Sequence, residues 1–511
     1  MNQREHWATR IGLIFAMAGN AIGLGNFLRF PVEAAKHGGG VFMIPYIVSL
    51  FLIGIPLMWL EWTIGRYAGI RGHGSPPAFL SLGWRHPIAK YLGVVGLFTP
   101  TVIAIYYVYI ESWTLAYGFF SLTNSLPTID HKEVQDINAY LTPFHTFHKN
   151  FLGDTDGTLL YPHRYAYIAF IITLFLNMFI LSKGVVKGIE RVAKIAMPLL
   201  FLFAIVLLVR VFTLKNPVNP DVNIVTGLKY IWEPDFSRIS DPSIWLAAAG
   251  QIFFTLSLGT GAIQVYASYL REKDDVALSG FATATSNELA EVILGGSIAI
   301  PAAIIFFGVV NAQEIAQSGA FRLGFITLPA VFQNLPFGNI FGALWFFLLF
   351  FAGITSSLAL CQPAISFLED ELKLSRKESA LLLGIIIFFS SHLVIFFKGA
   401  IDEMDFWAGT FGLVLFATIE AVVFMWIFGA EKVWEELHKG ADIRIPRIFF
   451  YILKYISPLL LLIILGTWFW KYFSRIGETA SWNIFLTRGF LIYLFVFMCA
   501  VVGIVWKRRE E

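Results

Sequence analysis

Two apolar segments of this chain carry residue types that can bind small cations and carboxylates. The first, residues 10–30, reads RIGLIFAMAGNAIGLGNFLRF and is interrupted by Gly19, Asn20, Gly23, Gly25 and Asn26. Glycine weakens a helix by roughly 1 kcal/mol relative to alanine, and open backbone at membrane depth is tolerated only where it is buried in protein or lines a cavity. Transporters hold ions and substrate at such breaks, so the segment predicts a transport site.

A second break strengthens that hypothesis. Residues 250–266, GQIFFTLSLGTGAIQVY, are interrupted by Ser257, Gly259, Thr260 and Gly261. Amides and hydroxyls lie near both breaks or in two later apolar segments: Asn26, Thr255, Asn287, Thr355, Ser356 and Ser357. Single hydroxyls often bond within their own helix, but a set that coincides with two breaks suits Na⁺. Because a half-helix N-terminus holds a carboxylate and free carbonyls hold a cation, the ligand that fits is an amino acid.

Charged residues near the ends of these segments suggest gates. Arg29 follows the first break, Asp405 lies near the outer end of a later span, and Arg4 with Asp370 could form the inner counterpart. A simple interfacial position is the alternative for each charge. The sequence has no zinc-protease, nucleotide-binding or serine-hydrolase motif, so we expect no enzyme and no organic cofactor. His145 and His148 have the spacing of a metal pair, but they lie in a polar loop.

The composition places these segments in a membrane. Of the 511 residues, 57% are hydrophobic and 14% are charged, against about 25% charged in soluble domains. By the length that a spanning helix needs, twelve transmembrane helices are expected, at 10–36, 40–69, 88–122, 165–183, 190–213, 241–269, 276–307, 337–370, 375–396, 399–427, 446–472 and 483–507. Most of the 37 Lys and Arg residues then fall in the terminal segments and alternate loops, which predicts cytoplasmic termini. We expect an all-α, multi-pass protein of the cell's inner (plasma) membrane, without a cleaved signal peptide or disulfides, since Cys361 and Cys499 both lie in spans.

The two breaks lie in the first and sixth of these spans. Matching breaks five spans apart suggest two five-helix repeats, residues 10–213 and 241–427, of which the second is inverted. Residues 446–507 would add two accessory helices within a single transporter domain, residues 1–511. We expect a polar outer loop at 123–164, short helices over the entrance at 308–336, and a cytoplasmic amphipathic helix at 428–445.

Several longer motifs resemble the neurotransmitter:sodium symporter family. They are GNAIGLGNFLRFP at 19–31, GQIFFTLSLGTGA at 250–262, FAGITSSLA at 351–359 and DEMDFWAGT at 402–410, and the similarity runs along essentially the whole chain. The resemblance implies an inverted repeat of two five-helix halves plus two extra helices, with spans 1 and 6 unwound at the midplane. It also implies sodium-coupled uptake of a neutral, hydrophobic L-amino acid, leucine-like or larger, by alternating access.

Carried onto matching positions, the resemblance implies the site residues as well. One Na⁺ would contact the Ala21 carbonyl, Asn26, Thr255, Asn287 and the substrate carboxylate. A second Na⁺ would contact the Gly19, Ile22 and Ala352 carbonyls with Thr355 and Ser356. The substrate would contact Ala21, Leu24, Gly25, Ile103, Tyr107, Phe254, Thr255, Ser257, Thr260, Ser356 and Leu360, with Tyr107 and Phe254 as its lid. Arg29 and Asp405 would form the outer gate, and Arg4, Trp7, Ser268, Tyr269 and Asp370 the inner one.

Two positions refine this picture. Glu291 lies four residues after Asn287, on the same helical face, near the place where animal members of the family need chloride. A carboxylate here would supply the negative charge itself, which predicts chloride-independent transport, and proton counter-transport on Glu291 stays open. Thr260 stands where a leucine-transporting member has phenylalanine, so an amino acid bulkier than leucine is also compatible with the site.

Three alternatives to a symporter remain at this point. A transporter of the same fold for another small solute, such as a betaine or nucleobase, lacks support because the carboxylate-and-sodium constellation is intact. A transport-deficient amino-acid receptor would bind ligand with sodium but accumulate nothing, and a membrane enzyme has no catalytic constellation. The expected partners are the amino acid, sodium ions and the lipid bilayer, not nucleic acid, and a homodimer is left open.

Overall fold

The computed structural model describes residues 5–128, 137–154, 157–216, 222–473 and 481–510. These residues form an all-helical fold, in which ten helices are long and apolar enough to cross a membrane. One further span is α1 (Arg10–Ala21) with α2 (Leu24–Lys36), bent by 44° at the break. The sixth expected span is divided into α12 (Pro242–Thr255) and α13 (Ala262–Ala267), each too short to cross alone. The prediction of an all-α, multi-pass fold is confirmed.

The remaining elements follow in chain order, where η marks a π-helical turn except in η4, which is a 3-10 turn. Up to the second break they are α3 (Gly40–Ser49), η1 (Leu50–Gly54), α4 (Ile55–Gly69), α5 (Pro76–Gly83), α6 (Ala89–Leu92), α7 (Val95–Leu122), α8 (Ile137–Leu152), α9 (Arg164–Ser182), η3 (Val185–Glu190), α10 (Arg191–Phe212), α11 (Ile224–Trp232) and η4 (Phe236–Arg238). After it they are α14 (Val276–Glu288), η5 (Leu289–Gly295), α15 (Gly296–Phe307), α16 (Val309–Gln317), α17 (Ala320–Arg322), η6 (Leu323–Thr327), α18 (Leu328–Gln333), α19 (Gly338–Asp370), α20 (Arg376–Phe396), α21 (Ala400–Met404), η7 (Asp405–Gly412), α22 (Leu413–Val422), η8 (Val423–Gly429), α23 (Ala430–Leu437), α24 (Ile448–Tyr451), η9 (Ile452–Ile456), α25 (Ser457–Phe473) and α26 (Trp482–Glu510). The short helices expected within 308–336 and the helix expected within 428–445 are therefore present.

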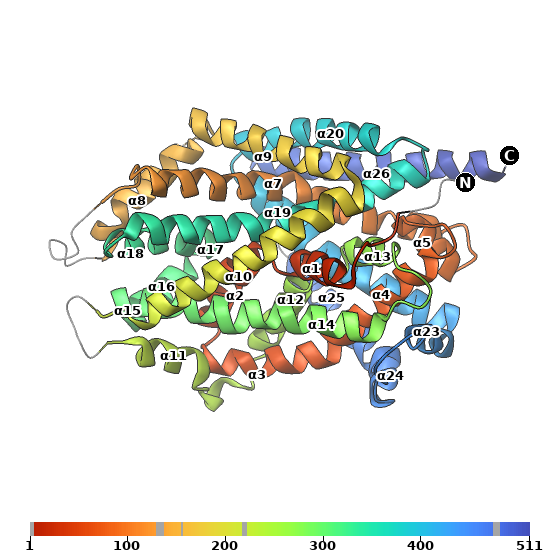
Figure 1. The fold of residues 1–511 in the computed structure, drawn as a ribbon, viewed down its shortest axis with the longest axis horizontal. Helices are drawn as coiled ribbons and strands as arrows, with labels where there is room; N and C mark the ends of the chain where they lie inside the picture. Colours follow the sequence, from red (N-terminus) through yellow and green to blue (C-terminus); the bar gives the residue numbers. More distant parts are fainter. Residues whose placement is uncertain (1–4, 129–136, 155–156, 217–221, 474–480, 511) are drawn as a thin grey trace.

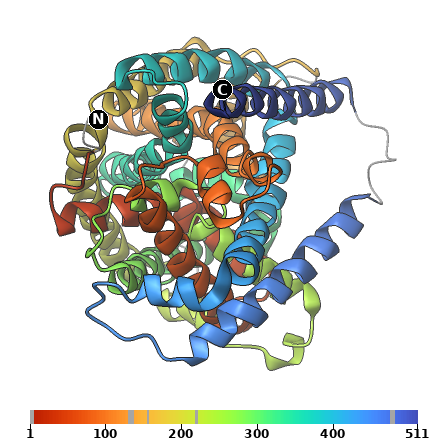
Figure 2. The same ribbon diagram turned by 90° about the vertical axis from the view of Figure 1, so that its right-hand side faces the viewer.

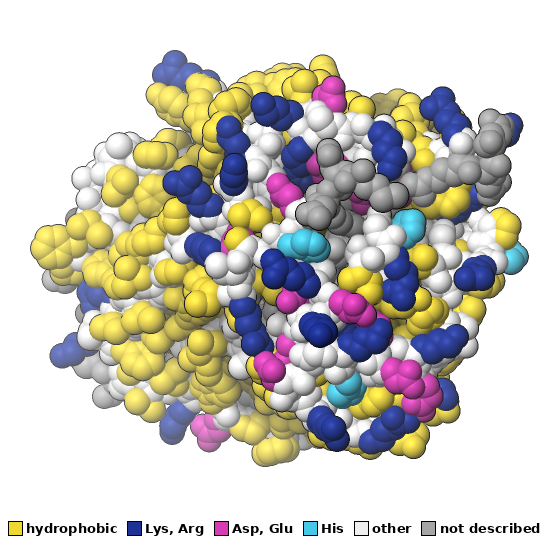
Figure 3. Space-filling model, turned by 45° about the vertical axis from the view of Figure 1, so that its right-hand side comes forward, with side chains coloured by type: hydrophobic (Ala, Val, Ile, Leu, Met, Phe, Trp, Pro, Cys, Tyr) yellow, Lys and Arg dark blue, Asp and Glu magenta, His cyan; other side chains and the backbone are white. Residues whose placement is uncertain are grey.

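The spanning helices run along the long axis of the molecule, and the connecting segments gather at its two ends (Figure 1). α8, α11, α16 and α18 lie at one end, while both termini, α5, α23 and α24 lie at the other. Lys and Arg side chains crowd the end with the termini, and hydrophobic side chains cover the surface beside it (Figure 3). Because cytoplasmic segments of membrane proteins carry excess Lys and Arg, this distribution agrees with the predicted orientation.

The broken helices are enclosed by longer, intact ones. α1 packs against α10, α14 and α19, α13 packs against α4 and α19, and α7 packs along α19. α25 and α26 lie at the periphery of the bundle when it is viewed from the end with the termini (Figure 2). Open backbone in the middle of the bundle is thus shielded from lipid by protein, which is the condition for tolerating it at membrane depth.

Candidate functional site

The two breaks touch each other. α1 ends at Ala21 and α2 begins at Leu24, whereas α12 and α13 are separated by a turn with Gly259 and Gly261 in left-handed backbone, at φ 69° and 74°. Ser257, itself at φ 55°, donates its hydroxyl to the Asn20 carbonyl at 2.9 Å. A non-glycine residue in this conformation is uncommon, and here its side chain joins the two broken helices.

Bare glycines let side chains approach the start of α2. A Cβ on Gly23 would lie 2.8 Å from both the Tyr107 hydroxyl and Ser356 Oγ, and a Cβ on Gly25 would lie 2.4 Å from the Phe254 ring. The Leu24 N–H donates to the Tyr107 hydroxyl at 3.0 Å. The open N-terminus of a helix favours negative charge, so this corner suits a carboxylate.

A cavity of about 40 Å³ lies at this corner, lined by Ala21, Gly23, Gly25, Asn26, Ile103, Tyr107, Phe254, Ser257, Thr260, Ser356, Leu360 and Leu413. Most residues of the expected substrate site therefore come together. Leu24 and Thr255 are not among the lining residues, since Leu24 contributes its N–H to Tyr107 and Thr255 faces Asn26 and Asn287. Leu413 is an addition that the sequence did not reveal, because one more leucine in an apolar span carries no signal.

The hydroxyl of Thr260 is used within the second break. It donates to the Ser257 carbonyl at 2.8 Å and accepts from the Ala262 N–H at 3.1 Å, which caps the start of α13. With both hydrogen-bonding roles satisfied inside the turn, the methyl group of Thr260 is the part left to line the cavity.

Oxygen atoms gather where the first sodium ion is predicted. Asn287 Oδ1 lies 3.2 Å from the Ala21 carbonyl oxygen and 3.3 Å from that of Thr255, and it accepts from Asn26 Nδ2 at 2.8 Å. Carbonyl and amide oxygens this close repel each other unless a cation lies among them. The alternative is that the Asn287 amide is turned over, so that its nitrogen donates to both carbonyls. Neutral and carboxylate oxygens are the ligands that hard cations prefer, so the donor set fits the predicted ion.

The second predicted sodium site joins α1 to α19. Ser356 Oγ lies 3.2 Å from the Gly19 carbonyl oxygen and 3.5 Å from that of Ile22, and Thr355 Oγ1 lies 3.2 Å from the Ala352 carbonyl oxygen. A Cβ on Gly19 would lie 2.8 Å from Thr355 Cβ. The glycine thus lets the end of α1 approach α19, and the five predicted donors come from α1, from Ile22 directly after it and from α19.

Glu291 lies directly behind the first oxygen cluster, in the π-helical turn η5. Its carboxylate accepts from Asn26 Nδ2 at 3.0 Å, from Gln251 Nε2 at 2.9 Å and from the Tyr46 hydroxyl at 3.1 Å, and it also accepts from the Thr255 hydroxyl. π-helical turns within α-helices occur often at functional sites. Gln251 and Tyr46 were not predicted, because neither has a pattern of spacing with Glu291.

Arg29 and Asp405, the residues predicted as the outer gate, do not form a direct ion pair with each other in the described part of the chain. The Arg29 guanidinium stacks over the Phe254 ring, 4.2 Å from its centroid, and the Tyr106 hydroxyl donates to Asp405 Oδ1 at 2.7 Å. Arg29 thereby lies against Phe254, which lines the cavity, and Asp405 lies against Tyr106, the residue before Tyr107 in α7.

At the opposite end, Trp7 Nε1 donates to the Tyr266 carbonyl at 3.0 Å, and Ser268 donates to the Val265 carbonyl. The Tyr269 hydroxyl shares a hydrogen bond with the Ser366 hydroxyl and accepts from Gln362 Nε2. The other amide atom of Gln362, Oε1, accepts from Arg376. Gln362 and Arg376 extend the predicted inner gate, and Arg4 lies outside the described residues. The partner predicted for it, Asp370, is the last residue of α19.

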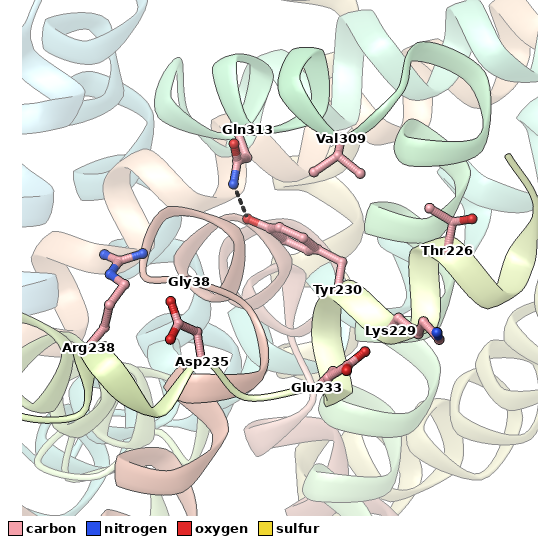
Figure 4. Close-up of a pocket in the computed structure, with 9 residues that line it drawn as sticks. All are labelled: Gly38, Thr226, Lys229, Tyr230, Glu233, Asp235, Arg238, Val309 and Gln313. Carbon is pink, nitrogen blue, oxygen red and sulfur yellow. Dashed lines mark hydrogen bonds between the residues drawn. The ribbon is translucent and has the colours of Figure 1, made fainter.

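A larger depression lies elsewhere in the described residues. A depression of about 390 Å³ lies between α11 and α16, lined by Gly38, Thr226, Lys229, Tyr230, Glu233, Asp235, Arg238, Val309 and Gln313 (Figure 4). Tyr230 crosses it and accepts from Gln313 at 3.1 Å. Its lining includes four charged side chains, Lys229, Glu233, Asp235 and Arg238, and none of the residues around the two breaks, so size alone does not identify the functional site.

The fold, together with a small cavity at two broken helices, defines a class of protein, the multi-pass membrane transporters. The chain belongs to the sodium:neurotransmitter symporter family, whose family model matches residues 4–150 and 162–509. Members of this family are sodium-coupled transporters rather than enzymes, and the predicted resemblance is confirmed.

Three comparisons illustrate the family. A sodium-dependent transporter of Methanocaldococcus jannaschii is 33% identical over 475 residues, covering 90% of this chain and 89% of its own. The sodium- and chloride-dependent GABA transporter 2 of Mus musculus is 26% identical, covering 85% of this chain and 75% of its own. The crystal structure of MhsT in complex with L-phenylalanine superposes with a TM-score of 0.75 at 29% identity, covering 90% of this chain and 99% of that one.

Proposed function

We propose that this protein is a symporter that takes up a neutral, hydrophobic L-amino acid together with two sodium ions and without chloride. One observation carries the proposal: two clusters of oxygen donors, one at Ala21 and Asn287 and one at Gly19 and Ser356, flank a single cavity at two broken helices. We also propose that residues 10–213 and 241–427 are inverted repeats, and that both termini lie in the cytoplasm.

Coupling follows from the position of the first cluster. Asn26 belongs both to this cluster and to the cavity lining, so a sodium ion here would touch a carboxylate bound at the start of α2. Each ligand then raises the affinity of the other by the same factor, as linkage requires. Release towards the cytoplasm follows when the site opens inward, down the sodium gradient.

The lining favours a hydrophobic substrate. Ile103, Phe254, Leu360 and Leu413 are apolar, and Thr260 contributes its methyl group. No charged side chain lines this cavity, which supports a neutral amino acid. The relative MhsT was crystallised with L-phenylalanine, and a pocket of this kind distinguishes one methylene by only about 1–3 kcal/mol, so leucine and larger side chains are both proposed.

Competition binding followed by uptake tests the proposal. Purified protein should bind leucine, phenylalanine or a similar amino acid only with Na⁺ present, and vesicles containing it should accumulate that amino acid when Na⁺ is higher outside. Sodium-dependent binding without accumulation would favour the receptor alternative. Binding that is indifferent to Na⁺ would contradict the proposed function.

A further inference from the structure

Residues 5–9 form a non-helical segment before α1 begins. The segment crosses that end of the bundle where both termini lie. On one side it is fixed to the region of α13. Trp7 Nε1 donates to the Tyr266 carbonyl at 3.0 Å, the Trp7 ring meets the Tyr266 ring edge-on, and His6 Nδ1 lies 3.1 Å from the Tyr269 carbonyl oxygen. Trp7 and Tyr269 are among the residues predicted for the inner gate.

On its other side the segment is fixed to the start of α10 by a carboxylate that this gate does not include. Glu190, the last residue of η3, is 1% exposed. Its Oε2 accepts from the Ala8 N–H at 2.9 Å and its Oε1 accepts from the Thr9 hydroxyl at 2.8 Å. Close by, Glu5 accepts from the Val185 N–H at 2.8 Å, at the beginning of the same turn.

The first turn of α1 is shaped to admit this carboxylate. A Cβ on Gly12 would lie 2.1 Å from Glu190 Oε1 and 2.4 Å from Glu190 Cγ. The remaining partner is Lys194, whose Nζ lies 2.7 Å from Oε1 and whose side chain is 38% exposed. Lys194 belongs to α10 itself, so the hydrogen bonds of Glu190 that reach the N-terminal segment are those from Ala8 and Thr9.

We propose that Glu190 is a positioning residue that fastens the start of α1 to α10 and thereby holds the inner side of the transport site closed. α1 carries the carbonyls of Gly19 and Ala21, and it packs against α10. If α1 moves away from α10, a buried carboxylate loses two hydrogen bonds. Hydrogen bonds to charged groups are the stronger kind, and a buried charge left without its partners is costly, so the contact favours the closed arrangement.

The inference rests on the proposed function only in calling the opened state inward-facing, because the fastening itself is measured without transport. The measurement is amide hydrogen exchange of the full-length protein in lipid nanodiscs containing Na⁺, followed over residues 8–21. In Glu190→Gln the exchange of these amides is expected to rise about tenfold, since the Ala8 N–H is itself a donor to the carboxylate. The sodium concentration that half-saturates amino-acid binding is expected to rise as well.

Two further variants separate the cause. Gly12→Ala keeps the carboxylate but displaces it, and it is expected to raise exchange as Glu190→Gln does. Lys194→Met removes the partner within α10 and is expected to leave exchange over 8–21 within twofold of the unaltered protein. If Glu190→Gln does not fold, Glu190→Asp and Gly12→Ala decide the question.

Unchanged exchange in Glu190→Gln and Gly12→Ala overturns the proposal. So does an equal rise in Lys194→Met, because the ion pair within α10 would then account for it. Failure of the unaltered protein to accumulate any amino acid would contradict the proposed function and leave the exchange result standing.

Discussion

Glu291 has four hydrogen-bond donors around its carboxylate and no Lys or Arg in an ion pair with it among the described residues. Donors from Asn26 and Thr255 are shared with the first oxygen cluster, so the charge of Glu291 lies next to the proposed sodium ion. A buried charge is costly without compensation. In this arrangement the proposed sodium ion and the carboxylate of Glu291 would compensate each other's charge.

The first prediction concerns chloride. Uptake by the unaltered protein should change less than twofold when chloride replaces a larger, impermeant anion, because Glu291 already supplies the charge. Glu291→Ser should transport only with chloride present. Glu288→Gln is the matched control: Glu288 accepts from Tyr46 at 2.8 Å and from Asn287 Nδ2 at 3.4 Å but has no hydrogen bond with Asn26 or Thr255, so its variant should stay chloride-independent. A doubling of uptake by chloride in the unaltered protein would contradict the assignment.

A second prediction at this scale uses Thr260. Because its hydroxyl is bonded within the break, Thr260→Ser should keep the order of substrate preference. Thr260→Phe adds a ring to the cavity and should weaken phenylalanine binding at least tenfold more than leucine binding, measured by competition against a labelled amino acid. An unchanged ratio of the two affinities would show that Thr260 does not border the substrate side chain.

Individual residues could be predicted where a motif carried them. Asn26, Thr255, Asn287, Thr355 and Ser356 come together as the resemblance implies. Leu413, Gln362 and Glu190 could not be predicted, because an apolar residue or an isolated polar one in a span shows its role only through neighbours from distant helices.

At the scale of elements, the broken helices depend on close backbone approach. Gly19→Ala should push α1 from α19, since the added Cβ would lie 2.8 Å from Thr355 Cβ. We expect a tenfold or greater loss of apparent sodium affinity, measured by sodium titration of amino-acid binding. Gly466→Ala in α25 is the control, because a Cβ there meets no atom within 4 Å. Equal sodium affinities in the two variants would argue against a sodium ion at this junction.

The sequence predicted both breaks and the bounds of most spans closely, because glycine clusters and long apolar runs have direct structural meaning. It did not predict the π-helical turns η5 and η7, which carry Glu291 and Asp405. In helices buried on most sides, apolar residues occur all round, so a local change of helical period leaves no trace in the pattern of hydrophobicity.

At the scale of the whole molecule, α8 packs at the end of the bundle opposite the termini (Figure 1). His148 is buried there, bonds to the Tyr117 hydroxyl at 2.8 Å and stacks on Phe325. Burial, with a smaller effect of His145, lowers the pKa of His148 to about 4, against about 6.5 in an unfolded chain. The unfolded state therefore binds more protons between these two values, and stability falls as pH drops through this window.

The corresponding prediction is a lower melting temperature at pH 5 than at pH 7.5. In His148→Phe the difference in melting temperature between pH 5 and pH 7.5 should be smaller, whatever the melting temperature of this variant at pH 7.5. In His145→Asn, which changes an exposed side chain, the difference should be retained. Fluorescence-monitored melting in detergent measures both. A pH difference that is as large in His148→Phe as in the unaltered protein would assign it to other groups.

A carboxylate held in the protein at Glu291, in place of a transported chloride, would have an electrical consequence. In the proposed cycle two sodium ions cross with one zwitterionic amino acid, and without proton counter-transport the carboxylate of Glu291 keeps its charge. Two positive charges then move inward, and a potential of 100 mV, negative inside, contributes about 2.3 kcal/mol for each. Together the two charges contribute about three orders of magnitude to the accumulation ratio. A co-transported chloride would remove one net charge and so cancel half of this free energy. The protein would thus draw on membrane voltage as well as on the sodium gradient.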